Sequence, residues 1–382
     1  MSEPDHKPLL LIWGVYQDTE SYPNTRYRLQ FLRSLEEFEV SEITAPAAMP
    51  AWGKRHAMAR LVAACVIMAV AHLRIIWRLL ALGRRPDVAY IPYPAVPALA
   101  LLRLLPRRLR PKRVIVDAFI SIHDTVVSDR KLLRPGSLAS RLLHWLECIA
   151  YRQADLVITD TPLNADFIAS GFGLDPASVI ALPLSTNEID YVPLAYRPTG
   201  DHLTVLFIGT MIPLHGIETI LKAAKLLEQH PSIRFRLIGN GQEAFTVETA
   251  IQRGASNLQW QKDWLPAPEL AAEIARADVC LGIFDCGDKA QRVCPYKVYA
   301  YSAVGRAIIT AKTAWVELAT RGLNYAPYYA VEAGDSLALA EAILELRQDE
   351  TLRTHYANNS GKFYVDHLCN AISHSQLQTL LH

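Results

Sequence analysis

The sequence predicts an α/β protein that contains two doubly wound domains. With 382 residues, the chain is longer than one small hydrophobic core usually organises. Short apolar runs alternate with longer helical patterns, which is typical of parallel sheets covered by helices on both faces. The polar segment 193–201, PLAYRPTGD, separates two such series. We therefore expect a first domain over residues 1–195 and a second over residues 200–358.

The first series contains five apolar runs of strand length. We predict strands at Leu9–Trp13, Val88–Pro92, Val114–Asp117, Leu156–Thr159 and Val179–Leu182. We predict helices at Thr25–Phe38, Arg55–Leu82 and Ser137–Arg152. Each predicted strand is apolar almost throughout, as expected for a strand that is buried on both faces.

The second series repeats this design directly after the polar segment. We predict strands at residues 202–209, 233–239, 277–284, 306–310 and 328–331. We predict helices at residues 215–229, from Gln242 onward, within 295–305 and at 336–347. Pro295 suits a first helical turn and Gly305 suits a helix end, so these two residues should bracket the helix before the strand at 306–310.

Composition excludes several classes of protein. The chain is 51% hydrophobic and 20% charged, so it can bury large cores and is not disordered. Its six cysteines form no CxxC pair and have no histidine at a familiar metal spacing, so we predict no metal site and reduced thiols in a cytoplasmic protein. The segment Leu61–Leu82 has only eleven apolar residues before His72, short of the ~20 that a membrane span needs.

The net charge of +1 conceals one strongly basic segment, residues 54–113. Residues 51–113 contain thirteen lysines and arginines against the single acid Asp87. Apolar and basic residues alternate there at helical spacing, which favours a surface that docks on an anionic membrane. The alternative is a buried helix whose arginines extend to solvent. Nucleic acid is not an expected partner, because aromatic residues are sparse there and no nucleic-acid-binding motif appears.

Polar, glycine-containing loops follow the predicted strands of the second domain. In open α/β sheets ligands bind at the carboxyl ends of the strands, and we expect the two domains to face each other across a cleft there. In GTMIPLHG, Gly209 and Gly216 allow a tight turn and close approach to a helix start, and His215 can add a donor. Gly239 and Gly241 repeat the design one strand later. The alternative is that these glycines serve turn geometry alone.

Two further loops carry charged residues. In DCGDKAQRVCPYK, Lys289, Arg292 and Lys297 lie close to a helix start and suit an anion, although a charge run of this kind is also ordinary for a solvated loop. In the first domain, DAFISIHDTVVSDR contains candidate groups for acid–base work or acceptor binding: Asp117, His123 and Asp124. A histidine in such a loop is more often a structural hydrogen-bonding group.

The order of these motifs resembles that of GT-B glycosyltransferases of the family-four kind. The resemblance rests on FIGTMIPLHGIETILKAAKLL, RLIGNGQ, ADVCLGIFD and RVCPYKVYAYSAVGRAIIT in the second half of the chain. It is looser in the first half, over PDVAYIPYP, VIVDAF, HDTVVSDR and ECIAYRQADLVITDTPLNADFI.

The resemblance implies two Rossmann-like domains, with a nucleotide-diphospho-sugar, UDP- or GDP-linked, on the second domain and an acceptor on the first. It also implies retention of the anomeric configuration, no obligatory metal or other cofactor, and a C-terminal helix, residues 359–382, that returns to the first domain. Docking on the inner membrane face through a basic, apolar patch is common among such enzymes.

This sequence departs from the family pattern at four positions. Thr210 and His215 stand where the family usually has an arginine and a lysine for the diphosphate, and Arg292 and Ala300 stand where it has two glutamates. Arg292 and Lys297 can offset the cations that the first loop lacks. Ala300 cannot accept a hydrogen bond from a ribose, so the candidate replacements are Tyr299, Tyr301 and Ser302, of which helical direction lets only some face the cleft.

We therefore predict a peripheral membrane glycosyltransferase for polysaccharide or glycolipid biosynthesis, acting on a lipid-linked or glycan acceptor. In this hypothesis Arg292 and Lys297 stabilise the departing diphosphate, while Asp117, His123 and Asp124 contact sugar and acceptor hydroxyls. The missing glutamates motivate an alternative, a catalytically weak or inactive partner of a true transferase in a membrane glycan-assembly complex. A third hypothesis keeps the fold and changes the reaction, for example to epimerisation of a nucleotide sugar.

Overall fold

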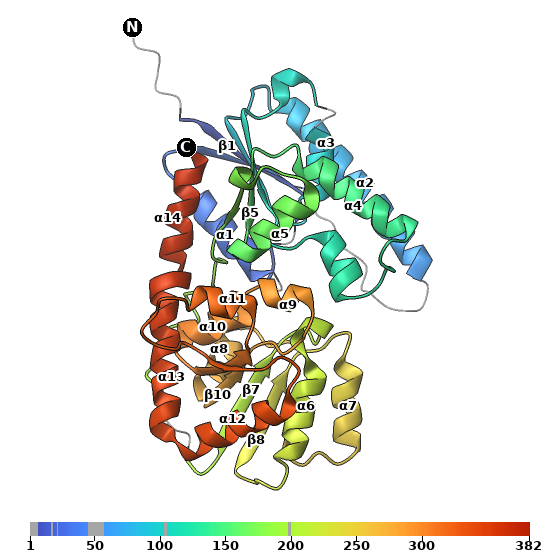
Figure 1. The fold of residues 1–382 in the computed structure, drawn as a ribbon. Helices are drawn as coiled ribbons and strands as arrows, with labels where there is room; N and C mark the ends of the chain where they lie inside the picture. Colours follow the sequence, from blue (N-terminus) through green and yellow to red (C-terminus); the bar gives the residue numbers. More distant parts are fainter. Residues whose placement is uncertain (1–6, 17, 21, 45–56, 103–104, 198–199) are drawn as a thin grey trace. The chain divides into compact units, whose positions relative to one another are not determined.

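The computed structural model describes residues 7–16, 18–20, 22–44, 57–102, 105–197 and 200–382 (Figure 1). The chain divides into two compact units. Unit 1 comprises Met1–Val127, Leu132–Leu182 and Gln376–His382, and unit 2 comprises Ser128–Lys131 and Pro183–Ser375. Each unit contains, within the described residues, one sheet of six parallel strands. The prediction of two doubly wound domains is confirmed.

The sheet of unit 1 has the strand order β2-β1-β3-β4-β5-β6. Its strands are β1 (Leu9–Gly14), β2 (Glu39–Thr44), β3 (Val88–Ile91), β4 (Arg113–Asp117), β5 (Leu156–Thr159) and β6 (Val179–Ala181). Its main helices are α1 (Pro23–Arg33), α2 (Ala57–Ala81), α3 (Val96–Leu102), α4 (Leu138–Tyr151) and α5 (Pro162–Phe172), and a π-helical turn covers Asp124–Asp129.

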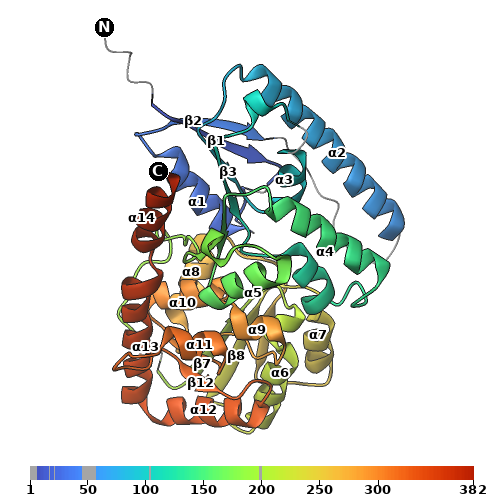
Figure 2. The ribbon, with the colours of Figure 1, turned by 45° about the horizontal axis from the view of Figure 1, so that its top comes forward.

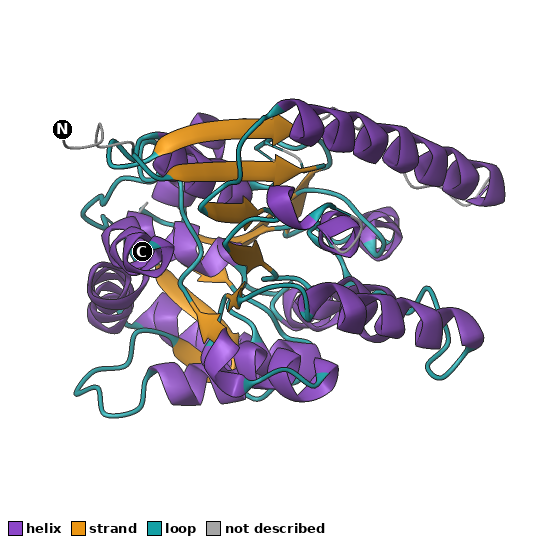
Figure 3. Ribbon diagram, turned by 90° about the horizontal axis from the view of Figure 1, so that it is seen from above, coloured by secondary structure: helices purple, strands orange, loops and turns teal. Residues whose placement is uncertain are grey.

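Helices cover both faces of this sheet (Figures 2 and 3). On one face, buried residues of α2, α3, α4 and α5 form a single core with the strands. On the other face α1 packs with the last helix of the chain, α14 (Asn370–Leu381), whose Leu377 and Leu381 join Leu29 and Leu32 in a second core. The end of the chain therefore completes the core of unit 1.

The sheet of unit 2 has the strand order β12-β11-β10-β7-β8-β9. Its strands are β7 (Leu203–Ile208), β8 (Ile233–Ile238), β9 (Leu258–Gln261), β10 (Val279–Leu281), β11 (Ala307–Ala311) and β12 (Tyr329–Val331). Its helices are α6 (Ile217–Leu226), α7 (Ala244–Gln252), α8 (Ala267–Arg276), α9 (Asp288–Arg292), α10 (Tyr296–Val304), α11 (Ala314–Ala319), α12 (Ser336–Gln348) and α13 (Glu350–Phe363). Helices α6, α7 and α12 share one core with the strands, and α10 packs against α8 and α13.

The structure confirms a helix between Pro295 and Gly305, α10, and adds a separate short helix, α9, before it. Arg292 ends the short helix α9, Val293 is extended with φ −102° and ψ 150°, and only then does α10 begin. Pro295 disfavours helical backbone at the residue before it, which explains the break. The predicted role of Gly305 is confirmed, because it ends α10 in a left-handed conformation with φ 75°.

No helix in the described part of the chain is both long and apolar enough to cross a membrane. Within the predicted basic segment, Lys54, Arg55 and Arg103 lie outside the described residues, as does part of the predicted linker, residues 198–199.

Candidate functional site

The loop between β7 and α6 is shaped by two glycines. A Cβ atom on Gly209 would lie 2.8 Å from both His215 Cε1 and Lys297 Nζ, so only glycine lets those side chains approach the backbone this closely. Gly216 has φ +64°, and a Cβ there would lie 2.7 Å from the backbone of Phe284. Between them, buried Met211 has φ 44°, a conformation that non-glycine residues adopt rarely and that concentrates at functional sites.

Lys297 places a buried ammonium group beside this loop. It lies in the first turn of α10, and among the described residues its Nζ has no hydrogen-bond partner. The nitrogen is 3.9 Å from the centre of the Phe207 ring, a cation–π contact that compensates only part of the lost hydration. Burial therefore lowers the pKa of Lys297 well below its ordinary value. An unpaired, buried ammonium is costly to keep, and an anionic ligand would satisfy it.

His215 also contacts the Phe207 ring. Its imidazole meets Phe207 edge to face, with ring centres 5.5 Å apart, and its buried Nδ1 has no hydrogen-bond partner in the described chain. Burial, reinforced by the positive charges of Lys297, Arg130 and Lys289, lowers the pKa of His215 well below 6.5. The imidazole is therefore neutral at neutral pH, so it offers a hydrogen bond rather than the positive charge of the lysine expected at this position.

Gly239 and Gly241 let the next loop pack directly on the first. A Cβ on Gly239 would lie 2.2 Å from the Gly209 carbonyl oxygen, and one on Gly241 would lie 1.6 Å from that of Thr210. Both contacts are between backbones, so no side-chain movement could relieve the clash. The packing of the two loops thus requires glycine at both positions, which were predicted to bind a ligand. The exposed side chain of Thr210 lies at the junction of the two loops.

The other predicted cations belong to α9. Lys289 Nζ is 3.1 Å from Asp129 Oδ2 in a largely buried ion pair, within unit 2. Arg292 is partly buried and engaged with neighbouring groups. The structure therefore brings Gly209, His215 and Lys297 into direct contact, and it places Arg292 on a separate helix from Lys297.

Tyr301 is fully buried rather than open to a ligand. Its hydroxyl accepts a hydrogen bond of 2.8 Å from the backbone N–H of Ile208, the last residue of β7. Ala300 is also buried. This hydrogen bond joins α10 to the strand whose following loop carries Gly209, so Tyr301 positions Lys297 relative to that loop.

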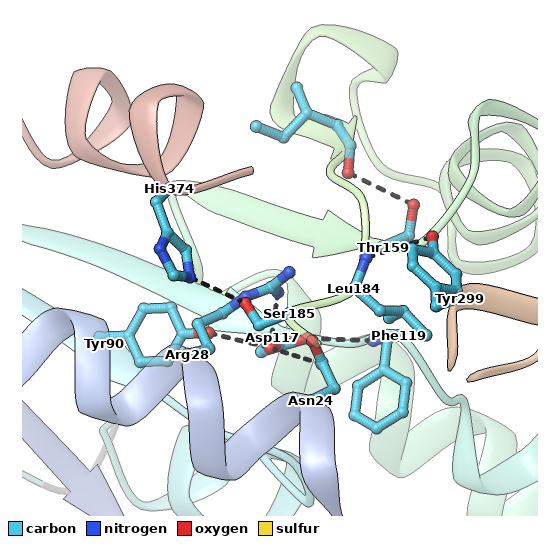
Figure 4. Close-up of polar contacts among 11 residues, drawn as sticks. Asn24, Arg28, Tyr90, Asp117, Phe119, Thr159, Leu184, Ser185, Tyr299 and His374 are labelled. Carbon is cyan, nitrogen blue, oxygen red and sulfur yellow. Dashed lines mark hydrogen bonds and ion pairs between the residues drawn. The ribbon is translucent and has the colours of Figure 1, made fainter. Parts of the chain in front are cut away.

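In unit 1, Asp117 is the centre of a buried polar cluster at the end of β4 (Figure 4). Its Oδ2 accepts hydrogen bonds from Arg28 Nη1 at 2.8 Å and from the Tyr90 hydroxyl at 2.9 Å, and Asn24 Nδ2 lies 3.5 Å away. Burial, followed by the adjacent Asp117 carboxylate, raises the pKa of Tyr90 well above 10, which keeps its hydroxyl protonated as a donor. The carboxylate predicted to contact a substrate is thus committed to contacts within the protein.

His123 and Asp124 lie in a loop that is held by Glu147, a residue that sequence reasoning missed. The fully buried Glu147 carboxylate accepts the backbone N–H groups of Ile122 at 2.9 Å and His123 at 2.8 Å, and the Ser121 hydroxyl at 2.9 Å. Burial raises the pKa of Glu147, although these hydrogen bonds offset part of the shift. His123 Nε2 lies 3.1 Å from Ser140 Oγ, and burial lowers its pKa.

No group of three or more histidine, cysteine or acidic side chains within the described residues is arranged to hold a metal ion. Cys148, Cys280, Cys286, Cys294 and Cys369 are free thiols.

Two family models match the chain. The model described as glycosyl transferases group 1 matches residues 202–349, and the model of a glycosyl transferase 4-like domain matches residues 26–185. Among curated proteins, the D-inositol 3-phosphate glycosyltransferase of Actinosynnema mirum is 32% identical over 94 residues. That alignment covers 22% of this chain and 22% of the relative, about a fifth of each.

Solved structures with the same fold cover nearly the whole chain. Sucrose-phosphate synthase from Thermosynechococcus elongatus superposes with a TM-score of 0.74 at 16% identity, covering 98% of both chains. Anabaena HepE in complex with UDP superposes with a TM-score of 0.68 at 12% identity, covering 98% of this chain and 99% of HepE. A complex of HepE with UDP-glucose gives a TM-score of 0.67 at 13% identity, with the same coverage.

The two family models lie on the two halves of the chain and together match most of it, and the structural neighbours share its two parallel sheets. On these grounds the chain belongs to the group 1, family-four-like glycosyltransferases, which have the GT-B fold.

Proposed function

We propose that this protein transfers a sugar from a nucleotide-diphospho-sugar to a lipid-linked or glycan acceptor at the cytoplasmic face of a membrane, with retention of the anomeric configuration. The observation that carries the proposal is the buried ammonium of Lys297 beside Gly209, which has no hydrogen-bond partner among the residues that the structure describes. The family to which the chain belongs, and the UDP and UDP-glucose bound to HepE, support a nucleotide sugar as the donor.

In this proposal the diphosphate of the donor lies against Gly209 and the first turn of α10. Lys297 supplies a positive charge in a site of low dielectric, His215 donates a hydrogen bond, and the free amides of the helix start face the same phosphate oxygens. Negative charge on the diphosphate grows as its bond to the sugar breaks. Groups already in place would therefore stabilise the transition state more than the ground state.

The acceptor site in this proposal uses His123 and Asp124, which the buried Glu147 holds in position through the backbone. Because the pKa of His123 is lowered, its imidazole is neutral and suited to hydrogen bonding with a hydroxyl. We assign Asp117 a positioning role, since its carboxylate binds Arg28 and Tyr90.

The test begins with thermal shift of the full chain in the presence of UDP, GDP, UDP-glucose and other nucleotide sugars. A ligand at 100 times its Kd should stabilise the protein by about 2.7 kcal/mol. The donor that shifts the melting temperature is then incubated with a lipid extract, and products are followed by mass spectrometry and by NMR of the anomeric centre. Transfer with retained configuration supports the proposal, and inversion contradicts that part of it.

One observation favours the alternative of an inactive partner subunit. Arg292 and Ala300 stand where the family pattern has glutamates, and Ala300 is buried and has no polar side-chain group. Calorimetric titration separates the two functions: absence of binding to every nucleoside diphosphate and nucleotide sugar would contradict the transferase and favour the partner.

The membrane part of the proposal rests on an apolar surface on two helices of unit 1. Val66, Val70, Leu73, Trp77 and Leu80 of α2, and Leu138, Leu142, Trp145 and Leu146 of α4, are exposed large apolar residues. Within each helix they follow a spacing of three and four residues, so they share one face, opposite the residues that enter the core. Arg74, Arg78 and Arg141 lie among them in the sequence, as expected for a helix on an anionic membrane.

Replacing Leu73 and Trp77 together by serine should remove the two most exposed of the large apolar side chains described on α2. The two side chains are 66% and 72% exposed, so their loss should leave folding intact and lower membrane affinity at least about tenfold. The measurement is co-sedimentation with vesicles of phosphatidylcholine, with and without anionic phosphatidylglycerol. Leu337→Ser, at an exposed leucine of unit 2, is the control. Membrane docking would be contradicted if the double variant bound vesicles as well as the wild type does. It would also be contradicted if the wild-type protein formed dimers and did not bind vesicles.

A further inference from the structure

Asp129 has a buried carboxylate of which only one oxygen atom is paired. It belongs to the segment Ser128–Lys131, which is part of unit 2 although the residues on either side of it belong to unit 1. Its side chain is 2% exposed, and Lys289 Nζ lies 3.1 Å from Oδ2. The other oxygen, Oδ1, is buried and has no hydrogen-bond partner among the residues that the structure describes. A buried acceptor without a donor is costly to keep, and a ligand that supplies a hydroxyl group would satisfy it.

Contacts on two sides hold this segment beside the loop between β7 and α6. On one side, Lys289 belongs to α9, whose Ala290 packs with Leu214 of that loop in a small apolar cluster. On the other side, the Arg130 carbonyl oxygen accepts a hydrogen bond of 3.3 Å from Gln242 Nε2. Gln242 comes directly after the glycine that packs on the backbone of the same loop. The segment therefore lies between two elements that both contact the loop of the candidate diphosphate site.

Three buried polar atoms without a hydrogen-bond partner in the described chain thus lie around this loop: Lys297 Nζ, His215 Nδ1 and Asp129 Oδ1. Burial, and then three nearby positive charges, lower the pKa of His215, and two of those charges belong to Arg130 and Lys289. These residues are the chain neighbour and the ion-pair partner of Asp129, which agrees with the grouping. An ammonium can only donate a hydrogen bond, whereas an ionised carboxylate can only accept one. The set suits a ligand that offers acceptors and donors close together.

We propose that Asp129 Oδ1 accepts a hydrogen bond from a hydroxyl group of the transferred sugar, while Lys297 and His215 bind the diphosphate. The inference rests on the proposed function and adds to it a residue that recognises the sugar part of the donor. In a nucleotide sugar the phosphate oxygens are acceptors and the adjacent sugar hydroxyls are donors, so one ligand can satisfy all three atoms. Lys289 permits a carboxylate next to a diphosphate, because its positive charge offsets the repulsion between the two anions.

This contact distinguishes a nucleotide sugar from a bare nucleoside diphosphate. UDP and GDP carry no sugar beyond the diphosphate, so they leave Asp129 Oδ1 without a donor. The same contact is lost once the sugar has been transferred. Asp129 therefore strengthens binding of the donor and not binding of the product.

The test is calorimetric titration of the full chain with UDP, GDP, UDP-glucose, UDP-N-acetylglucosamine and GDP-mannose. Asp129→Ala should weaken binding of the nucleotide sugar that the wild type prefers by roughly 10- to 150-fold, the effect of one hydrogen bond to a charged group. It should not weaken binding of the matching nucleoside diphosphate, because the variant has lost a negative charge. Asp288→Ala, at an exposed acid of α9, is the matched control and should bind every probe as the wild type does.

A double variant keeps the segment in place without the ion pair. Asp129→Val/Lys289→Met conserves the net charge and replaces a buried pair by apolar side chains, an exchange that proteins often tolerate. It should bind the nucleoside diphosphate like the wild type and still show the weakened binding of the nucleotide sugar, since it has no acceptor at position 129.

Two results would overturn the inference. One is nucleotide-sugar affinity of the double variant within about twofold of the wild type. The other is an equal loss for the nucleoside diphosphate in that variant, which would mean that Asp129 only supports the shape of the site. A wild-type chain that binds none of the five probes would overturn the proposed function itself, so the two failures are distinguishable.

Discussion

Replacing Lys297 by methionine should nearly abolish sugar transfer and, at the same time, make the ligand-free protein more stable. Loss of one preorganised charged donor typically lowers turnover by about 10²–10³-fold. The same change should weaken nucleoside diphosphate binding by about 1.5–3 kcal/mol, the usual contribution of a hydrogen bond to a charged group. Few substitutions are expected to move activity and stability in opposite directions.

The gain in stability follows from the environment of the ammonium group. Nζ of Lys297 is buried over Phe207 without a hydrogen-bond partner among the described residues, and methionine fills a similar volume without a charge. An unsatisfied buried donor costs about 1–3 kcal/mol, and more when it is charged. Because the pKa of Lys297 is lowered in the folded state, this cost is full below the lowered pKa and falls away as the pH rises from there to the ordinary lysine value of 10.5.

The measurement combines thermal unfolding at pH 7 with calorimetric titration of UDP or GDP. A rise in melting temperature of roughly 2–4 °C per kcal/mol is expected for a unit of this size. Lys312→Met, at an exposed lysine of unit 2, controls for the general loss of a positive charge and should change neither property. Unaltered nucleotide affinity, or a lower melting temperature, in Lys297→Met would rule out the anion-binding role.

Replacing Asp117 by alanine should destabilise unit 1 by about 3–5 kcal/mol, the typical cost of removing one partner of a buried ion pair. The substitution leaves the guanidinium of Arg28, which is 1% exposed, without its counter-charge and removes the acceptor of the Tyr90 hydroxyl. The double variant Arg28→Met/Asp117→Leu removes both charges, so it should recover much of the lost stability.

Hydrogen exchange measured by mass spectrometry is suited to this prediction, because it reports each unit separately. In Asp117→Ala, peptides of β1, β3 and β4 should exchange faster, while those of β7 and β8 keep their protection. Asp166→Ala, at an exposed position of α5, is the control. Unchanged protection in unit 1 would show that the Arg28–Asp117 pair contributes little to stability, and sugar transfer lost without unfolding would instead restore the predicted contact of Asp117 with a substrate.

The sequence was sufficient to predict the central strands and two of the four edge strands, β6 and β12. Runs such as residues 203–208 are apolar because both faces of a central strand are buried. The two strands that were missed, β2 and β9, lie at the edges of their sheets, where EVSEIT and LQWQ keep partly exposed polar side chains. A run of apolar residues therefore indicates a buried strand, and a strand with exposed polar side chains gives no such run.

The candidate site was predictable to the extent that its residues follow strands. The grouping of Gly209, His215 and Lys297 follows from the rule that ligands bind at the carboxyl ends of parallel strands. The role of Glu147 could not be predicted from the sequence. Two of its partners are backbone N–H groups, which are present in every sequence and mark no position. The burial of Asp117 and Tyr301 was equally invisible, since their partners are distant in sequence.

The return of the chain to unit 1 limits how this protein can be cut into pieces for study. Leu377 and Leu381 fill the core beside Leu29 and Leu32, although about 350 residues of sequence separate them. An expressed fragment that ends at the linker, near residue 195, would lack these side chains and expose an apolar groove along α1. A workable fragment of the first half must instead carry α14, fused through a short artificial connection.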